Sequence, residues 1–168
     1  MNNKLIQPKS PWLHIASVSI SDLTNYLWSL QRDNTNTVIR LIRSQNMCCD
    51  RDMFNEVSAA YQFPYYFGCN WNAFNECITD LVWLPADSYI TAIADYDYLI
   101  NKWPDGAKYL IDSLLYAAEE WSKPINQGEK WDRPAKSFHI ILHSSSDIIS
   151  SFLQKHGIET TDLAIVTT

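Results

Sequence analysis

The sequence predicts one α/β domain built on a mainly parallel β-sheet, and three observations support this class. Short apolar segments alternate with segments whose apolar residues recur every three or four positions, which is typical of strands alternating with helices. A chain of 168 residues is long enough for one ordinary hydrophobic core. Hydrophobic residues make up 46% of the composition and charged residues only 19%, so much of the surface must be neutral or aromatic.

The N-terminal part of the chain predicts two strands and two helices. Apolar residues recur at helical spacing after Ser21, which is a suitable N-cap. The next predicted helix must end before Pro64, because the residue before a proline avoids helical geometry. In order, we expect an arm (1–11), a strand (12–20), a helix (21–30), a strand (38–43) and a helix (50–63).

The clearest helical pattern of the chain lies between Asn70 and Pro85. Asn70 can cap the start of the helix, and Pro85 lies just beyond its end. Five apolar residues at spacings of three and four form one continuous stripe, which we expect to face the core. These residues are Phe74, Cys77, Ile78, Leu81 and Val82.

The C-terminal part predicts three further strands between helices. His139 and His143 would share one face of a strand, since they are four residues apart. The expected elements are a strand (88–96), a short helix (97–103), a long amphipathic helix (105–121), a polar loop (123–136), a strand (137–143), a helix (145–158) and a terminal strand (163–168).

The charge of the chain limits its partners. The formal net charge is −6 and the isoelectric point is near 5.0, so direct binding of nucleic acid is not expected. No segment approaches the roughly 20 consecutive apolar residues that span a bilayer, and the first residues show no secretory signal. We therefore expect a cytoplasmic protein without membrane contact, monomeric when free.

The cysteines and histidines give no metal-ligand spacing. Cys48 and Cys49 are adjacent and could bridge each other only with strain, while Cys69 and Cys77 lie far along the chain. The four histidines are scattered, so we expect no metal, no cofactor, and reduced thiols that are mostly buried. Most of the tryptophans, Trp131 included, are expected to pack in the core or between helices.

Residues 63–85, "FPYYFGCNWNAFNECITDLVWLP", resemble the barstar family, the protein inhibitors of guanyl-type ribonucleases. The resemblance implies a small parallel sheet packed with helices, with a barstar-like core at about 37–143 and added elements at 1–36 and 144–168, all within one domain, 1–168. The residues that carry it are Pro64, Tyr66, Phe67, Gly68, Asn70, Ala73, Cys77 and Asp80.

In that family, the loop and helix at this position plug the active site of the nuclease, and acidic side chains stand in for substrate phosphate. Carried over, the loop aromatic residues fall on Tyr66 and Phe67, the two helix carboxylates on Asn72 and Glu76, and the intervening tryptophan on Asn75. This sequence therefore departs from the pattern: an amide replaces one acid, the other acid is a methylene longer, and the ring is absent.

The residues themselves also indicate a binding face for a basic partner. Polar residues at spacings of three and four lie opposite the apolar stripe, and no lysine or arginine lies within 66–80. Residues 66–120 contain nine acidic and two basic residues, a net charge of −7 that would steer a basic protein. The predicted contact residues are Tyr66, Phe67, Asn70, Asn72, Asn75, Glu76, Thr79 and Asp80.

Two functions of different classes remain open. One is an immunity protein or inhibitor that occludes the active site of a basic toxin nuclease; the alternative is a non-catalytic regulatory module with a non-nuclease partner. An enzyme ranks last, because no nucleophile or base stands at a useful offset from Glu76 and Asp80. We expect one ring of Tyr66 and Phe67 to point inward and one outward, and Gly68 to adopt a positive φ.

Overall fold

The computed structural model describes residues 4–144 and 146–165, and it confirms the α/β class. One five-stranded sheet has the order β2-β3-β4-β1-β5, and each neighbouring pair of strands is parallel. The central strands β3 and β4 are buried along their whole length. The strands are β1 (Leu13–Ala16), β2 (Thr37–Arg43), β3 (Ser88–Ala94), β4 (Ser137–His143) and β5 (Thr161–Asp162).

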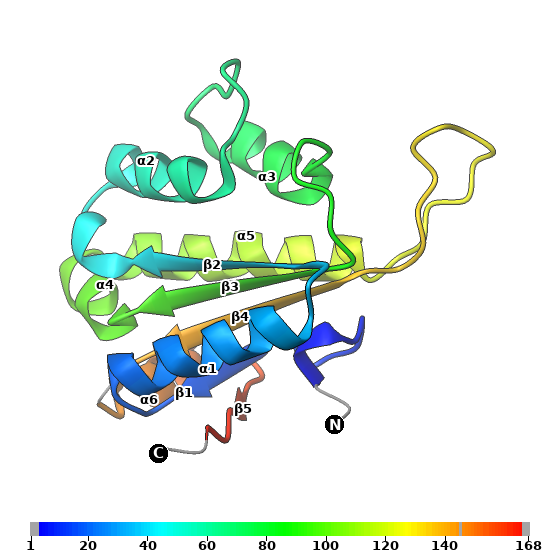
Figure 1. Ribbon diagram of the computed structural model, residues 1–168. Helices are drawn as coiled ribbons and strands as arrows, with labels where there is room; N and C mark the ends of the chain where they lie inside the picture. The colour runs from blue at the N-terminus through cyan, green and yellow to red at the C-terminus, as the bar shows by residue number, and fades with distance from the viewer. Residues whose placement is uncertain (1–3, 145, 166–168) are drawn as a thin grey trace.

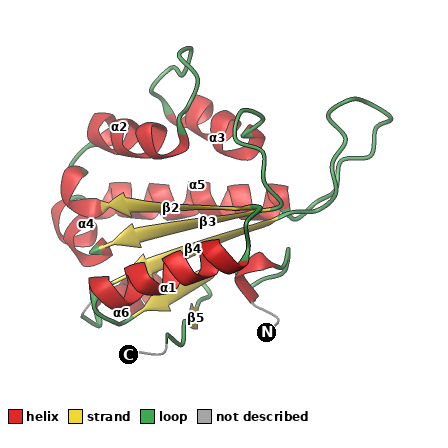
Figure 2. Cartoon of the chain, viewed as in Figure 1, coloured by secondary structure: helices red, strands yellow, loops and turns green. Residues whose placement is uncertain are grey.

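Helices cover both faces of this sheet (Figures 1 and 2). In Figure 1, α1 lies in front of the sheet and α5 lies behind it, with α2 and α3 together above its upper edge. The loop from α5 to β4 extends away from the rest of the chain at the right of the view. The α-helices are α1 (Ile20–Asp33), α2 (Asp50–Tyr61), α3 (Trp71–Asp80), α4 (Tyr96–Lys102), α5 (Pro104–Trp121) and α6 (Ile148–Lys155), and the 3₁₀ turns are η1 (Lys4–Ile6) and η2 (Ser44–Asn46).

The larger core lies on the face covered by α2, α3, α5 and α6, and it holds the base of α3 in place. The Trp121 indole N–H at the end of α5 donates to the Ile78 carbonyl oxygen of α3 at 2.9 Å. The Tyr61 hydroxyl of α2 shares a 2.6 Å hydrogen bond with Thr91 Oγ1 of β3. Both bonds are buried, so they fix the register between the helices and the sheet beneath them.

The smaller core lies on the opposite face, where α1 and η1 cover the sheet. Leucines of α1 pack there on Ile90 and Ala92 of β3 and on Ile141 of β4. Because side chains alternate along a strand, His139 and His143 share this face of β4, as predicted. The residues before β2 therefore bury the second face of the β2–β3–β4 sheet.

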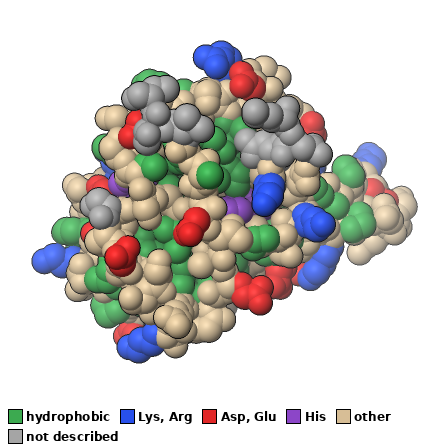
Figure 3. Space-filling model, turned by 90° about the horizontal axis from the view of Figure 1, so that it is seen from below, with side chains coloured by type: hydrophobic (Ala, Val, Ile, Leu, Met, Phe, Trp, Pro, Cys, Tyr) green, Lys and Arg blue, Asp and Glu red, His purple; other side chains and the backbone are tan. Residues whose placement is uncertain are grey.

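Two histidines of this face form a directed chain of hydrogen bonds. His139 Nε2 lies 2.9 Å from the Gln7 carbonyl oxygen, which can only accept, so Nε2 carries the proton. His139 Nδ1 then accepts from His14 Nε2 at 3.0 Å, and His14 Nδ1 accepts from the Thr161 hydroxyl at 3.0 Å. Burial lowers the pKa of His14 to about 4, with smaller contributions from His139 and Lys4. Desolvation also lowers the pKa of His139. In the space-filling view of this side, histidine atoms, coloured purple, form only small patches at the surface (Figure 3).

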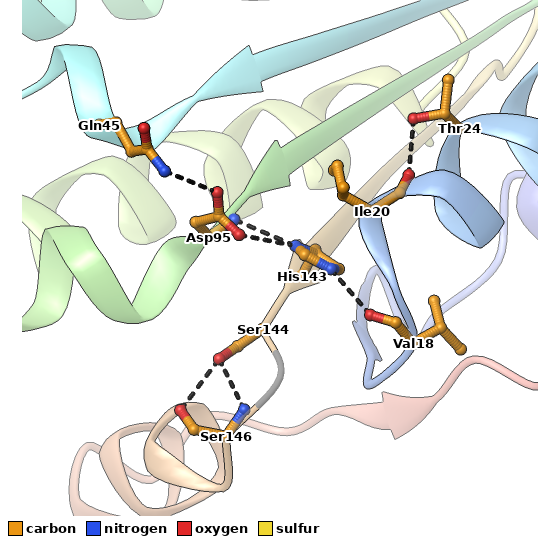
Figure 4. A network of polar contacts seen from close by, with 8 residues as sticks. All are labelled: Val18, Ile20, Thr24, Gln45, Asp95, His143, Ser144 and Ser146. Carbon is orange, nitrogen blue, oxygen red and sulfur yellow. Dashed lines mark hydrogen bonds and ion pairs between the residues drawn. The ribbon is translucent and has the colours of Figure 1, made fainter.

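The third histidine of this face joins the segment between β1 and α1 to the central strands (Figure 4). His143 Nε2 donates to the Val18 carbonyl oxygen at 2.9 Å, between β1 and α1. Its Nδ1 accepts from the Asp95 backbone N–H at 3.1 Å, at the end of β3. Gln45 Nε2 in turn donates to Asp95 Oδ2 at 3.0 Å, so one network links four segments at the carboxyl edge of the sheet.

Several predicted boundaries are wrong at the ends of elements. The first strand covers only Leu13–Ala16, and α1 is capped by Ser19 rather than Ser21, because the Ser19 hydroxyl accepts from the Asp22 N–H at 3.1 Å. The predicted terminal strand is also misplaced. The structure has its last strand at Thr161–Asp162, residues 163–165 form none, and residues 166–168 lie outside the described part.

Three predictions about burial also need correction. Val82 is 73% exposed, because α3 ends at Asp80 and Leu81 turns the chain with a φ of 44°. The thiols are not mostly buried: Cys48 and Cys69 are exposed, Cys49 is half-buried, and Cys77 alone among the four is buried. Trp131 is 62% exposed on the long loop before β4.

Candidate functional site: the exposed face of α3 and the loop before it

The loop 62–70 presents two tyrosine rings to solvent and packs a half-buried phenylalanine against the core. Tyr66 is 76% exposed, whereas Phe67 packs edge-on against Phe54 and Phe63, with ring centroids 5.8 and 5.0 Å apart. The prediction of one ring inward and one outward is therefore confirmed. Tyr65, which sequence reasoning did not select, is fully exposed beside Tyr66. The aromatic pair that faces solvent is thus Tyr65 and Tyr66.

The turn into α3 depends on an asparagine cap and a left-handed cysteine. Asn70 Oδ1 accepts from the Ala73 N–H at 3.0 Å, which confirms Asn70 as the N-cap. The positive φ predicted for Gly68 belongs instead to Cys69, whose φ is 48°. Gly68 is small for another reason, because a Cβ there would lie 3.0 Å from Asn70 Nδ2 and disturb the capping side chain.

The start of α3 is fastened to α2 and α5 by an indole ring. Trp71 Nε1 donates to Asp50 Oδ1 in the first turn of α2 at 3.1 Å. The same ring packs against Phe54 of α2 and Tyr109 of α5, with centroids 5.2 and 5.9 Å away. These contacts hold the helix from below, so its outer face is presented on a rigid support.

The outer face of α3 carries the predicted polar residues at different depths. Asn72, Glu76 and Asp80 are exposed, whereas Asn75 and Thr79 are half-buried. The Thr79 hydroxyl donates to the Asn75 carbonyl oxygen at 2.7 Å, so its proton is already used within the helix. The Asn75 side-chain oxygen Oδ1 is buried and has no hydrogen-bond partner among the described residues.

The carboxylates of this face are free, whereas several other acids of 66–120 are paired. Neither Glu76 nor Asp80 has an ion-pair partner within the described part of the chain. Asp112 pairs with Lys108 at 2.5 Å, and Glu120 pairs with Lys123 at 2.6 Å. The accessible negative charge at α3 therefore comes from its own two acids.

The fold brings two basic residues into the same cavity as Asp80, although they lie far from it in the sequence. A surface cavity of about 420 Å³ is lined by Thr79 and Asp80 together with Arg133 and Lys136. The Arg133 guanidinium stacks 4.2 Å from the centre of the Trp121 ring, and desolvation lowers its pKa. It also donates to carbonyl oxygens at the end of α5, including Glu120 O at 3.1 Å. Glu76 does not line this cavity.

Comparisons with solved structures show the fold alone. The chain is similar to two structures of the Aeropyrum pernix ORC2 protein, one of ADPNP–ADP complexes and one of the ADP form. The first is 10% identical with a TM-score of 0.59 and covers 90% of this chain, and the second is 8% identical with a TM-score of 0.62 and covers 93%. This chain spans 41% and 43% of those longer chains. Its four glycines form no phosphate-binding P-loop pattern.

Comparison with protein families is more informative. No curated protein matches the chain. In the described part, no helix is both long and apolar enough to cross a membrane. The family Barstar, described as barnase inhibitor, matches residues 38–143, which is more than half of the sequence and runs from β2 to the end of β4. The chain therefore belongs to the barstar family.

Proposed function

We propose that this protein is a cytoplasmic inhibitor, or immunity protein, that blocks the active site of a basic toxin nuclease with α3 and the loop before it. The observation that carries this proposal is the free carboxylate of Glu76, exposed on a firmly supported helix in a member of the barstar family. The protein would bind as a monomer and perform no catalysis of its own.

The chemistry of the face suits a phosphate-binding site. A nuclease active site gathers cations to hold the substrate phosphate, and a carboxylate offers the same charge and oxygen acceptors. Glu76 projects such a carboxylate, and Asp80 follows it one helical turn later. A carboxylate desolvated against arginine or lysine forms short, charge-assisted hydrogen bonds, which are stronger than neutral ones.

The neutral residues around Glu76 add directional hydrogen bonds without adding charge. Asn72 is exposed one turn before Glu76, and its amide both donates and accepts. The buried Asn75 Oδ1 lacks a donor, and a donor from a docked partner would satisfy it after a small side-chain rotation. Asn72 and Asn75 stand where the resemblance to the barstar family places an acid and a tryptophan. These two amides would select a partner whose active site is less uniformly basic.

The exposed rings of Tyr65 and Tyr66 extend this face on the side of the loop. Tyrosine supplies a large contact area with few rotatable bonds, so ordering it at an interface costs little conformational entropy. We therefore assign these rings to the apolar part of the contact and Glu76 to its electrostatic centre.

Calorimetric titration of three variants tests the proposal. The probes are barnase and, separately, any basic, toxin-like protein that a gene neighbouring this one is found to encode. Glu76→Ala should lose about 2–5 kcal/mol of binding free energy, because it leaves cations of the partner buried and unpaired. Glu76→Gln should lose much of the same energy, since it keeps the shape and removes the charge. Asp80→Ala should lose less, because Asp80 lines a cavity together with Arg133 and Lys136 of its own chain.

Glu119→Ala is the matched control, since it removes the same charge from an exposed position on α5. Glu119 lies away from the proposed site, in a different cavity that residues near both ends of the chain also line. It should bind like the wild type. Melting curves of all four variants should change little, because exposed substitutions usually shift stability by less than about 0.5 kcal/mol. If Glu76→Ala binds normally while a change near the chain ends abolishes binding, the partner docks elsewhere and the proposed site is wrong. A bound partner without nuclease activity would support the regulatory alternative instead.

A further inference from the structure

The junction between η2 and α2 brings two thiols and a carboxylate together. Cys48 precedes the helix, Cys49 is its N-cap residue, and Asp52 lies in its first turn. The two sulfur atoms and a carboxylate oxygen of Asp52 all lie within 4.8 Å of one another. The Cys48 thiol donates to Asp52 Oδ2 at 2.9 Å, and the Cys49 sulfur lies close to the same carboxylate.

The start of α2 creates this arrangement without help from distant segments. Asp52 follows Cys49 by three residues and Cys48 by four, so the first helical turn returns its carboxylate to the two sulfur atoms. The side chain of Cys49 makes no capping bond to the helix backbone, which leaves its sulfur available. The cluster is open to solvent, since Cys48 is exposed and Cys49 and Asp52 are half-buried.

The separations are close to those of a tetrahedral thiolate site. With metal–sulfur bonds of about 2.3 Å and metal–oxygen bonds of about 2.0 Å, a tetrahedral ion sets sulfur and oxygen about 3.5 Å apart. The Cys48 sulfur and Asp52 oxygen are 2.9 Å apart with a proton between them. Replacing that proton by an ion requires only a small widening, which rotation of the three side chains supplies.

We propose that Cys48, Cys49 and Asp52 form a binding site for Zn²⁺ or a similar thiophilic divalent cation, with the fourth coordination position open to solvent. Two thiolates and a carboxylate carry three negative charges against the two positive charges of the ion. Thiolate sulfur selects Zn²⁺ over Mg²⁺ and Ca²⁺, which prefer oxygen ligands. This inference is independent of the proposed inhibitor function.

The surrounding charges shape how such an ion would bind. Arg51 lies 3.7 Å from Asp52 Oδ1 but is 82% exposed, so it can swing away when an ion enters. Asp50, in the same helical turn, holds the Trp71 indole at the start of α3. Cysteine binds metal as the thiolate, so an entering ion must displace the thiol protons. Binding should therefore release protons and strengthen as the pH rises.

Cobalt substitution tests the site directly. The full chain is kept reduced with a phosphine and titrated with Co²⁺, while the charge-transfer absorption from thiolate to cobalt is recorded. Zn²⁺ is then added to compete for the site. The wild type should develop this absorption, lose it to Zn²⁺ at one equivalent, and melt at a higher temperature with Zn²⁺ than with a chelator. Cys48→Ser/Cys49→Ser should abolish the absorption. Asp52→Asn should weaken Zn²⁺ binding by at least about tenfold, since loss of outer-shell partners alone costs 10–100-fold.

Cys69→Ser is the matched control, because it removes another exposed thiol outside the cluster and should bind both ions like the wild type. Circular dichroism of each variant shows whether it is folded, and Asp52→Asn gives an answer even if the double cysteine variant is not. The inference is overturned if reduced wild type shows no charge-transfer absorption with Co²⁺. It is also overturned if the absorption persists in Cys48→Ser/Cys49→Ser, or if Asp52→Asn binds Zn²⁺ like the wild type.

Discussion

Acidification from pH 8 to pH 5 should destabilise this protein through the paired histidines His14 and His139. Both rings are almost completely buried, and the chain of hydrogen bonds from Thr161 to the Gln7 carbonyl uses both nitrogens of each neutral ring. A further proton would have to charge a ring in this buried site, and on His139 Nδ1 it would face the His14 Nε2–H. The folded protein therefore resists protonation, whereas the unfolded chain does not.

The direction of the effect follows from the pKa of His14. Burial lowers this pKa from 6.5 to about 4, so below pH 6.5 the unfolded chain binds the proton more readily. The contribution of His14 to the free energy of unfolding is fully present above pH 6.5 and is lost as the pH falls toward 4. For one histidine with these two pKa values, the loss at pH 5 is about 2 kcal/mol. His139 acts in the same direction, because burial lowers its pKa as well.

Urea unfolding followed by tryptophan fluorescence at pH 8, 7, 6 and 5, at constant ionic strength, measures this loss. His14→Gln should start from a lower stability at pH 8 and lose less on acidification, because one titrating ring is gone. His156→Gln, which changes an exposed histidine, is the control and should follow the wild type. A wild-type free energy of unfolding that stays constant between pH 8 and pH 5 would refute the reasoning, as would an equal loss in His14→Gln.

Three further predictions concern association and packing. The on-rate for the proposed basic partner should fall as salt is added, because the net charge of −7 in residues 66–120 acts over a Debye length of about 10 Å at 0.1 M. An on-rate that does not change with salt in stopped-flow mixing would contradict electrostatic steering. Tyr61→Phe should lower the free energy of unfolding by about 1–3 kcal/mol, since it leaves the buried Thr91 hydroxyl unpaired. In denaturant titrations, the double variant Tyr61→Phe/Thr91→Val should recover much of this loss, because it removes both partners of the bond. Gly106→Ala should lower the melting temperature despite the better helix propensity of alanine, because its Cβ would lie 2.0 Å from the Trp103 ring; an unchanged melting curve would show that the ring can move.

Local patterns in the sequence were sufficient for the elements nearest the site. Asn70 was predicted to cap α3, and the structure confirms it, because a cap depends on a side chain and a backbone N–H three residues apart. The burial of Phe74, Cys77 and Ile78 was also predicted, since helical periodicity alone decides which side of a helix is apolar. The resemblance of residues 63–85 to the barstar family is likewise local, and the family match confirms it.

The ends of elements were less predictable, because competing local choices decide them. Ser19 and Ser21 are both acceptable caps for α1, and the structure uses the one whose hydroxyl reaches the Asp22 N–H. Val82 continues the apolar stripe of α3 in sequence, but the left-handed turn at Leu81 directs the chain away and leaves Val82 in solvent. Periodicity indicates where a helix exists more reliably than where it stops.

By itself, the sequence determined the α/β class, the family, and the face of α3 that carries Glu76, because each depends on residues within a few positions of one another. Tertiary structure alone decided that β1 and β5 extend the sheet beyond β4, and that His14 meets His139 across 125 positions. It also decided that Arg133 and Lys136 line the same cavity as Asp80, whereas Glu76 does not line it. These pairings depend on how helices and strands pack, and packing joins residues whose distance along the chain carries no signal of their contact.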